Sequence, residues 1–136
     1  MKLKLSSIVL LAILPAHAHA ATLTAAEAEF LEQLVTAAAV LEQRCTGYEV
    51  NGAGGVQYGA RLLGSPNAAM AMIDAFDAAI KAHDGQGYDP GKFRPEVSEA
   101  SGKTFKQVRA DLIKSPKAAC AGYGDTGVER GLLRRF

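Results

Sequence analysis

The sequence predicts an all-α fold, a small helical bundle or an orthogonal helical array closed by one disulfide bond. Helix-start signals, a Ser or Thr with Glu, Gln or Pro at the right spacing, precede segments whose apolar residues return at helical intervals. No alternating run of β-branched and aromatic residues reaches five, so no strand is expected. The chain holds 2 cysteines, enough for one disulfide bond.

The first twenty residues have the three parts of an export signal. Lys2 and Lys4 carry positive charge, residues 6–14 are apolar, and the Ala-His-Ala sequence ending at Ala20 supplies the small residues before a signal-peptidase cut. The apolar run is shorter than the ~20 residues that span a bilayer, so no insertion is expected after cleavage. We expect cleavage after Ala20, or two residues earlier, and one domain over 21–136 in the periplasm or outside the cell.

A strong helix is expected directly after this signal. Thr24 and Glu27 have the spacing of a capping box, in which each side chain bonds a backbone N–H of the first turn. The apolar residues that follow indicate one buried face, with Gln33 lying off it. The helix is expected to end near Cys45, with Gly47 as its left-handed cap. The predicted face consists of Leu31, Leu34, Val35, Ala38, Leu41 and Cys45.

The middle of the chain combines a glycine-rich segment with a second strong helix. Glycines between residues 52 and 59 weaken regular structure, so only 56–63 is expected to form a short helix. Ser65 followed by Pro66 predicts a helix that runs to about His83. Its expected buried residues are Met70, Ile73, Phe76 and Ile80, and its expected i,i+4 ion pair joins Asp77 to Lys81.

Two more helices are expected after a loop over 84–95. Thr104 and Gln107 predict a second capping box and a helix ending near Lys114. A last short helix is expected to begin after Ser115 and to reach Cys120. Residues 125–136 follow as a tail that is either flexible or packed on the domain. The apolar residues of the first of these helices are Phe105, Val108, Leu112 and Ile113, and those of the tail are Leu132, Leu133 and Phe136.

Cys45 and Cys120 are expected to form the disulfide. An exported chain meets an oxidising compartment, where a lone pair of cysteines usually pairs. Free thiols are the alternative, but the spacing is unlike a C-x-x-C redox motif. Both cysteines begin the pattern C-x-G-Y, which ends at Tyr48 and Tyr123. We expect the tyrosines to cover the disulfide, and the alternative is a binding edge with two exposed tyrosines.

Charge and composition argue against several classes of protein. The chain has 15 Lys and Arg against 14 Asp and Glu, and loss of Lys2 and Lys4 leaves 13 against 14. Nucleic-acid binding is not expected from such a near-neutral chain. The composition is also not that of a disordered chain. Arginines at 130, 134 and 135 beside apolar residues leave contact with an anionic membrane surface as an alternative for the tail.

No catalytic residue, cofactor or metal is predicted. His83, the one histidine after residue 20, precedes Asp84 at a helix C-terminus, where capping is its expected role. Residues 84–89 lack the ligand spacing and the distal Glu of an EF-hand. Nucleotide-binding glycine motifs, a haem-attachment motif and a G-x-S-x-G nucleophile motif are all missing from the sequence.

The sequence therefore predicts an exported binding or interaction protein without a catalytic site. An accessory subunit, an inhibitor, an immunity protein or a small chaperone fits this description, with another periplasmic protein as the partner. Candidate contact residues are Tyr48, Tyr123, His83 and Tyr88, which lie in or beside predicted loops and helix ends.

Two alternatives belong to other functional classes. One is a carrier that holds a small ligand in an apolar pocket of the bundle. The other is an enzyme whose site is assembled from scattered residues. The pocket candidates are Met70, Met72, Phe76 and Phe105, and the enzyme candidates are His83, Asp84, Tyr88 and Asp89.

Overall fold

The computed structural model describes residues 21–43 and 45–136, so the predicted export signal lies outside the described residues. The described part contains five helices and two short strands, which confirms the predicted mostly helical fold and adds a very small sheet. In chain order the elements are α1 (Ala25–Glu42), β1 (Tyr48–Val50), α2 (Gly52–Leu63), α3 (Pro66–His83), α4 (Pro95–Lys114), α5 (Pro116–Arg130) and β2 (Leu133–Arg135).

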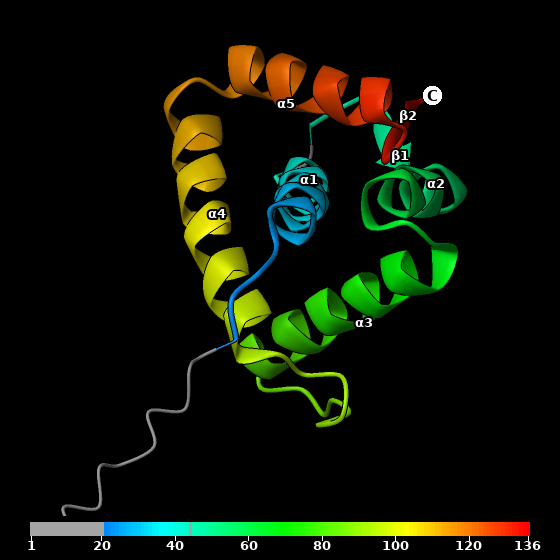
Figure 1. The fold of residues 1–136 in the computed structure, drawn as a ribbon. Helices are drawn as coiled ribbons and strands as arrows, with labels where there is room; N and C mark the ends of the chain where they lie inside the picture. Colours follow the sequence, from blue (N-terminus) through cyan, green and yellow to red (C-terminus); the bar gives the residue numbers. More distant parts are fainter. Residues whose placement is uncertain (1–20, 44) are drawn as a thin grey trace, which may run out of the picture.

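Helix α1 is the central element of the fold. Seen along its axis, α1 lies inside a frame formed by α2, α3, α4 and α5 (Figure 1). The predicted face is buried or partly buried, but the buried residues of α1 point in all directions, as expected of a helix enclosed by neighbours. Gln33, predicted to lie off that face, is buried for the same reason. The buried residues are Phe30, Leu31, Gln33, Val35, Thr36, Ala37, Ala39 and Val40.

Local capping signals position the first three helices. The predicted capping box of α1 is confirmed: the Glu27 N–H donates to Thr24 Oγ1 at 3.1 Å, and the Thr24 N–H donates to Glu27 Oε2 at 3.2 Å. Ser65 caps α3 as predicted, accepting a hydrogen bond from the Ala68 N–H. Helix α2 is longer than predicted because the Asn51 side chain caps it and starts it at Gly52.

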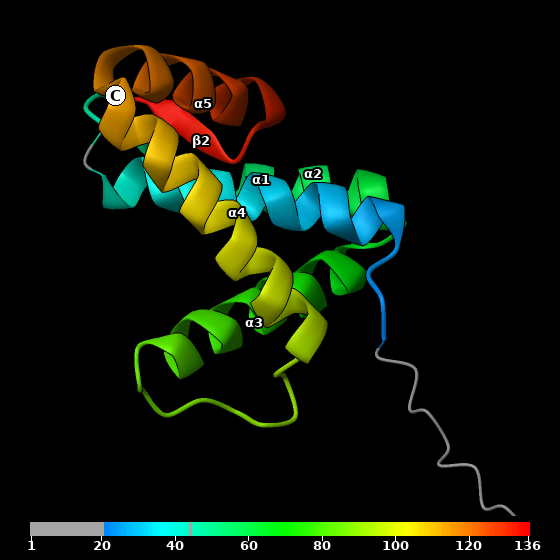
Figure 2. The ribbon, with the colours of Figure 1, turned by 90° about the vertical axis from the view of Figure 1, so that its left-hand side faces the viewer.

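Helix α4 is continuous, unlike the turn and shorter helix that the sequence predicts. It begins at Pro95, so Thr104 and Gln107 lie in its interior and the second capping box is wrong. The helix crosses α1 diagonally (Figure 2) and packs against it. This long contact stabilises as helix a segment whose own sequence is mostly polar.

Helix α5 extends past its predicted end at Cys120 and runs to Arg130. The prediction that the helix ends at Cys120, with Gly122 as its cap, is therefore wrong. Gly124, two residues later, is buried beneath the ring of Tyr48, where a β-carbon would lie closer than 3.0 Å to ring atoms. Burial of this ring offsets the low helix propensity of glycine. The helix ends at Gly131, whose φ of 86° is the left-handed conformation that glycine adopts readily.

The disulfide between Cys45 and Cys120 is confirmed. It joins the segment after α1 to the interior of α5, with the two Cα atoms 5.5 Å apart, a usual separation for a disulfide. Helix α1 ends at Glu42, earlier than predicted, and Gly47 has the predicted left-handed conformation with φ 87°. Neither cysteine therefore marks a helix end, although the two chain segments are joined as expected.

A two-stranded antiparallel ribbon is the element that the sequence did not predict. Tyr48 pairs with Arg135 and Val50 pairs with Leu133, so the last residues of the chain return to the segment after α1. Each strand has three residues, too few for an alternating pattern to be recognised. The chain end is therefore packed on the domain, with Leu132 and Leu133 buried, although Phe136 is exposed.

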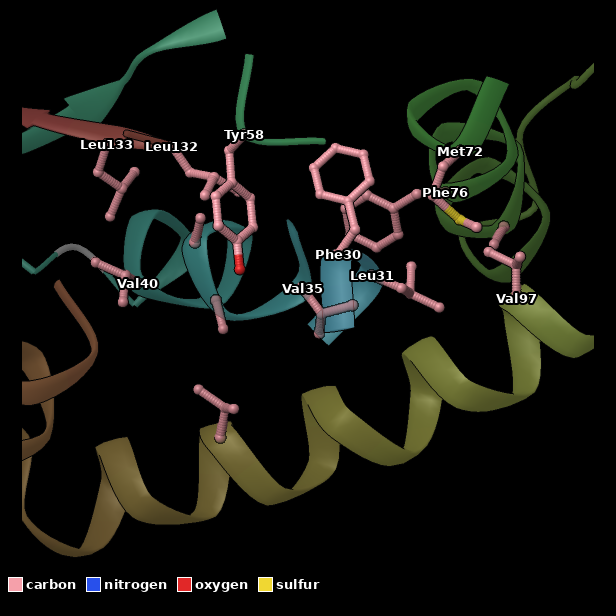
Figure 3. Close-up of a cluster of buried hydrophobic side chains, with 14 of the residues drawn as sticks. Phe30, Leu31, Val35, Val40, Tyr58, Met72, Phe76, Val97, Leu132 and Leu133 are labelled. Atoms are coloured by element: carbon pink, nitrogen blue, oxygen red, sulfur yellow. The ribbon is translucent and has the colours of Figure 1, made fainter. Parts of the chain in front are cut away.

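The core lies on all sides of α1. Figure 3 shows Phe30 and Leu31 of α1 near Met72 and Phe76 of α3, and the rings of Phe30 and Tyr58 lie 6.1 Å apart between centroids. Two predicted core residues are instead exposed: Met70 and Ile113, the latter at 71%. Their spacing follows the apolar pattern, but both side chains are exposed in the folded chain.

Candidate functional site

A groove with a volume of about 640 Å³ lies between α1, α3 and α4. The C-terminal halves of α1 and α3 form two walls, and α4 forms the third. The elements that directly follow α1 in the chain, β1 and α2, do not line the groove. Its lining residues are Ala38 and Glu42 from α1, Ala79, Ile80, His83 and the next residue Asp84 from α3, and Ser98, Ser101, Gly102, Phe105, Lys106, Arg109, Ala110 and Ile113 from α4.

The base of the groove is apolar. The Phe105 ring is stacked on the buried Phe76 ring, with 6.2 Å between centroids and 26° between planes. Ile80 is partly buried beside it, and the other apolar lining residues are mostly alanines with short side chains. Small side chains on three helices that face one another leave space, because none is long enough to reach the opposite wall.

An ion pair spans the edge of the groove from α4 to α1. The Arg109 guanidinium donates two hydrogen bonds to the Glu42 carboxylate, from Nε at 3.1 Å and from Nη2. The same guanidinium lies 5.2 Å from the centroid of the Phe105 ring. Hydrogen bonding to Glu42 raises the pKa of Arg109 above its ordinary value. The opposite charges of Arg109 and Glu42 cancel, so this pair adds no net charge to the rim around the apolar base.

Ser101, in the groove wall, has a buried side-chain hydroxyl without a hydrogen-bond partner in the part of the chain that the structure describes. Its side chain is buried, at 4% exposure, and its Oγ is the one buried side-chain polar atom among the described residues that has no hydrogen-bond partner. The neighbouring buried positions of α4 are valine and leucine. A buried hydroxyl without a partner costs free energy, so its position in the wall of a groove calls for an explanation.

The structure brings together candidates from both alternative functions. His83 and Asp84, two enzyme candidates, line the same groove as Phe105, a carrier candidate. His83 ends α3 as predicted, and Asp77 and Lys81 form the predicted ion pair at 2.7 Å one turn earlier.

The other carrier candidates lie elsewhere. Met72 lines a smaller cavity of about 370 Å³ at the start of α1, and Met70 is exposed. At this cavity Arg94 contacts Glu27 at 3.2 Å and Glu96 at 2.7 Å. The N–H groups at the start of α4 and the Arg94 guanidinium lower the pKa of Glu96. This second cavity therefore has charges that already satisfy one another.

The four predicted contact residues do not share a surface. Tyr48 is buried and donates a hydrogen bond to Asp125 at 2.7 Å, so it cannot form an exposed binding edge. Tyr123 donates to Asp111, and this bond raises its pKa to about 12. Tyr88, in the loop after α3, packs against Phe93 with 5.4 Å between centroids, apart from the groove that His83 lines.

The loop after α3 has a simple conformation. Asp89 accepts a hydrogen bond from the Gly91 N–H at 2.8 Å, which closes a local turn. Within residues 21–43 and 45–136, no three His, Cys, Asp or Glu side chains are placed so that they could hold a metal ion. The same residues include no helix with the length and apolar character needed to cross a membrane.

Sequence reasoning missed the residues that distinguish this groove: Ser101, Arg109 and Glu42. One signal was available, because Ser101 follows Val97 by four residues and continues the apolar stripe of α4 toward Val108. In comparisons with known proteins, no family model matches the chain, and no curated protein or solved structure is significantly similar to it. The groove must therefore be interpreted from its own chemistry.

Proposed function

We propose that this protein binds a small, largely apolar molecule in the groove between α1, α3 and α4. The observation that carries the proposal is an apolar groove of about 640 Å³ that no side chain of the described residues fills. Sites for small molecules usually have volumes of roughly 300–1,000 Å³, apolar walls and a few polar groups. The proposal follows the carrier alternative. Of its candidate residues, Phe105 lines the groove, whereas Met70 and Met72 do not, and other residues of α3 and α4 line it instead.

Binding outside the cytoplasm is part of this proposal. The Cys45–Cys120 disulfide supports it, because disulfides persist mainly in oxidising compartments. The charge pattern of residues 2–20 supports it independently.

A protein partner, the first expectation from the sequence, stays a prediction. The large exposed apolar side chains of the described residues come from several segments of the chain. They are Val50 in β1, Met70 in α3, Tyr88 in the following loop, Ile113 in α4 and Phe136 at the chain end.

The test is to block the groove with a side chain. Ala110 is an exposed residue of α4 that lines it, so Ala110→Trp places an indole in the space without replacing a buried residue. Ala118→Trp, on an exposed position of α5 outside the groove, is the matched control. Fragments of apolar and aromatic character are screened against the oxidised protein by ligand-detected NMR, and amide shifts locate the site.

We expect fragments that shift the amides of Ala38, Ala79 and Gly102, one from each wall, to lose binding in Ala110→Trp and keep it in Ala118→Trp. Binding that is unaffected by Ala110→Trp, or shifts spread evenly over the surface, would contradict the proposal. Circular dichroism of both variants checks that the helices are intact.

A further inference from the structure

We infer that the ligand is a neutral, mainly apolar molecule bearing an alcohol, phenol or carbonyl group, and that this group hydrogen-bonds to the Ser101 hydroxyl. The inference rests on the proposed binding function and names the chemistry of the same groove. It begins from the one buried side-chain polar atom in the described part that lacks a partner, Ser101 Oγ.

The position of Ser101 lowers the stability of the ligand-free protein. The residue lies on the buried stripe of α4 with Val97 and Val108, where an apolar side chain would pack without loss. A hydroxyl placed there forfeits its hydrogen bonds to water and gains none from the protein. A ligand that supplies a hydrogen bond removes this cost, and rotation about χ1 of a serine lets the hydroxyl turn toward it.

The charges around the groove favour a neutral polar group. Glu42 and Arg109 already neutralise each other at the edge. The remaining charged lining residues, Lys106 and Asp84, carry opposite signs and are exposed, so they keep their hydration at the rim. A charged group held at Ser101 would lie beside a hydroxyl alone, without a buried counterion, and would lose much more hydration free energy than an alcohol or carbonyl.

The apolar body of the ligand has its own surface. Phe105, on the same helix as Ser101, is stacked with Phe76 and has the Arg109 guanidinium 5.2 Å from its ring centroid, and Ile80 lines the groove from α3. Ring compounds gain from contact with these side chains through burial of apolar surface. The expected ligand is therefore a ring-containing alcohol, phenol or ketone whose polar atom points toward α4.

Three matched probes test the inference: naphthalene, 2-naphthol and 2-naphthoate, titrated at neutral pH and followed by the groove amides. They share one ring system and differ in having no polar group, a neutral hydroxyl or a carboxylate. The proteins are the wild type, Ser101→Ala and Ser115→Ala. Ser115 is an exposed serine between α4 and α5 that does not line the groove and makes no side-chain cap hydrogen bond, so it is the matched control.

We expect 2-naphthol to bind the wild type about fivefold more tightly than naphthalene, the gain of one net hydrogen bond. Ser101→Ala should abolish this preference, and Ser115→Ala should keep it. Ser101→Ala should also raise the melting temperature of the ligand-free protein, because it removes a hydroxyl without a partner.

The outcomes separate the two proposals. If no probe shifts the groove amides, the proposed binding function fails. If naphthalene and 2-naphthol bind equally, or their difference survives in Ser101→Ala, the groove binds apolar ligands and the inference about Ser101 is wrong. Tighter binding of 2-naphthoate than of 2-naphthol would overturn the neutral class and assign anion recognition to the cations at the rim.

Discussion

Two regions on either side of α1 use small residues in opposite ways. On the side of α5, the glycine at 124 is covered by the ring of Tyr48, which leaves no room for a β-carbon. On the side of α3, a β-carbon on Gly102 would meet no other atom within 4 Å, because it faces the open groove. Figure 1 shows the two sides, with α5 above α1 and α3 below it.

Comparison of the disulfide region with the groove shows that small residues alone do not make a binding surface. Next to a large residue they allow close packing, and the disulfide region gains stability from it. Where small residues from three helices face one another, they leave a groove. The covered region also has satisfied polar groups, such as Tyr48 bonded to Asp125, whereas the groove wall holds the unpaired hydroxyl of Ser101.

Removing the disulfide is expected to have the largest effect on this comparison. Cys45→Ser with Cys120→Ser opens a bond between residues 75 positions apart, which should lower the free energy of unfolding by about 4 kcal/mol through the entropy of the unfolded chain. Urea denaturation of the oxidised wild type and the double variant measures it, with the reduced wild type as control. An unchanged midpoint would show that packing alone holds the disulfide region.

A pair of glycine substitutions compares the two regions directly. Gly124→Ala should destabilise the protein by about 2 kcal/mol, because the new methyl group displaces the Tyr48 ring. Gly102→Ala should stabilise it by up to about 1 kcal/mol, since alanine is the better helix former and meets no neighbour. Thermal unfolding measures both changes in stability. If both substitutions stabilise or both destabilise the protein, the distinction between a covered and an open glycine is wrong.

Tyr123 tests the boundary between the regions, because its hydroxyl joins α5 to Asp111 of α4. Tyr123→Phe should cost about 1.5 kcal/mol at neutral pH, as expected for a hydrogen bond to a carboxylate. The bond to Asp111 raises the pKa of Tyr123 from 10.0 to about 12. The folded state therefore favours the protonated phenol, so this contribution is present below pH 10 and is lost between pH 10 and about 12.

Two measurements check the Tyr123 prediction. Denaturation at increasing pH should show the wild type losing its advantage over Tyr123→Phe across that interval. Phenolate absorbance should show one fewer tyrosine titrating near pH 12 in the variant than in the wild type. A difference in stability that is independent of pH would mean that the hydrogen bond to Asp111 contributes nothing.

The smallest effect is expected at the rim of the groove. Glu42→Gln leaves Arg109 without its ion pair, but the two side chains are 47% and 44% exposed, so the loss should be about 0.5 kcal/mol and should fall with added salt. A double-mutant cycle with Arg109→Met isolates the pair. A coupling above about 2 kcal/mol would show that the rim stabilises the fold as strongly as the covered side.

Signals between residues close in sequence predicted much of the fold. Thr24 with Glu27 and Ser65 with Pro66 start α1 and α3 where predicted, and Asp77 with Lys81 forms the expected ion pair. These interactions are complete within one or two turns of helix, so their geometry follows from spacing alone. The disulfide was predictable for another reason, since a chain with two cysteines has one pairing.

Errors arose where the deciding partner is distant in the chain. Helix α5 continues past Gly122 to Arg130, with Gly124 packed under Tyr48, and the ribbon exists because Leu133 pairs with Val50. A local sequence pattern predicts that such glycines end a helix, and it is too short to identify a three-residue strand. Met70 shows the reverse error, because it fits the apolar spacing of α3 yet its side chain is exposed.

Local signals and the cysteine count predicted the helical class, the starts of α1 and α3, and the pairing of Cys45 with Cys120. The enclosure of α1 and the groove with Ser101 in its wall arise only when helices distant in sequence pack together. Helix signals come from neighbouring residues, whereas a groove depends on how far helices stand apart. That distance is set by side chains that meet only in the folded chain.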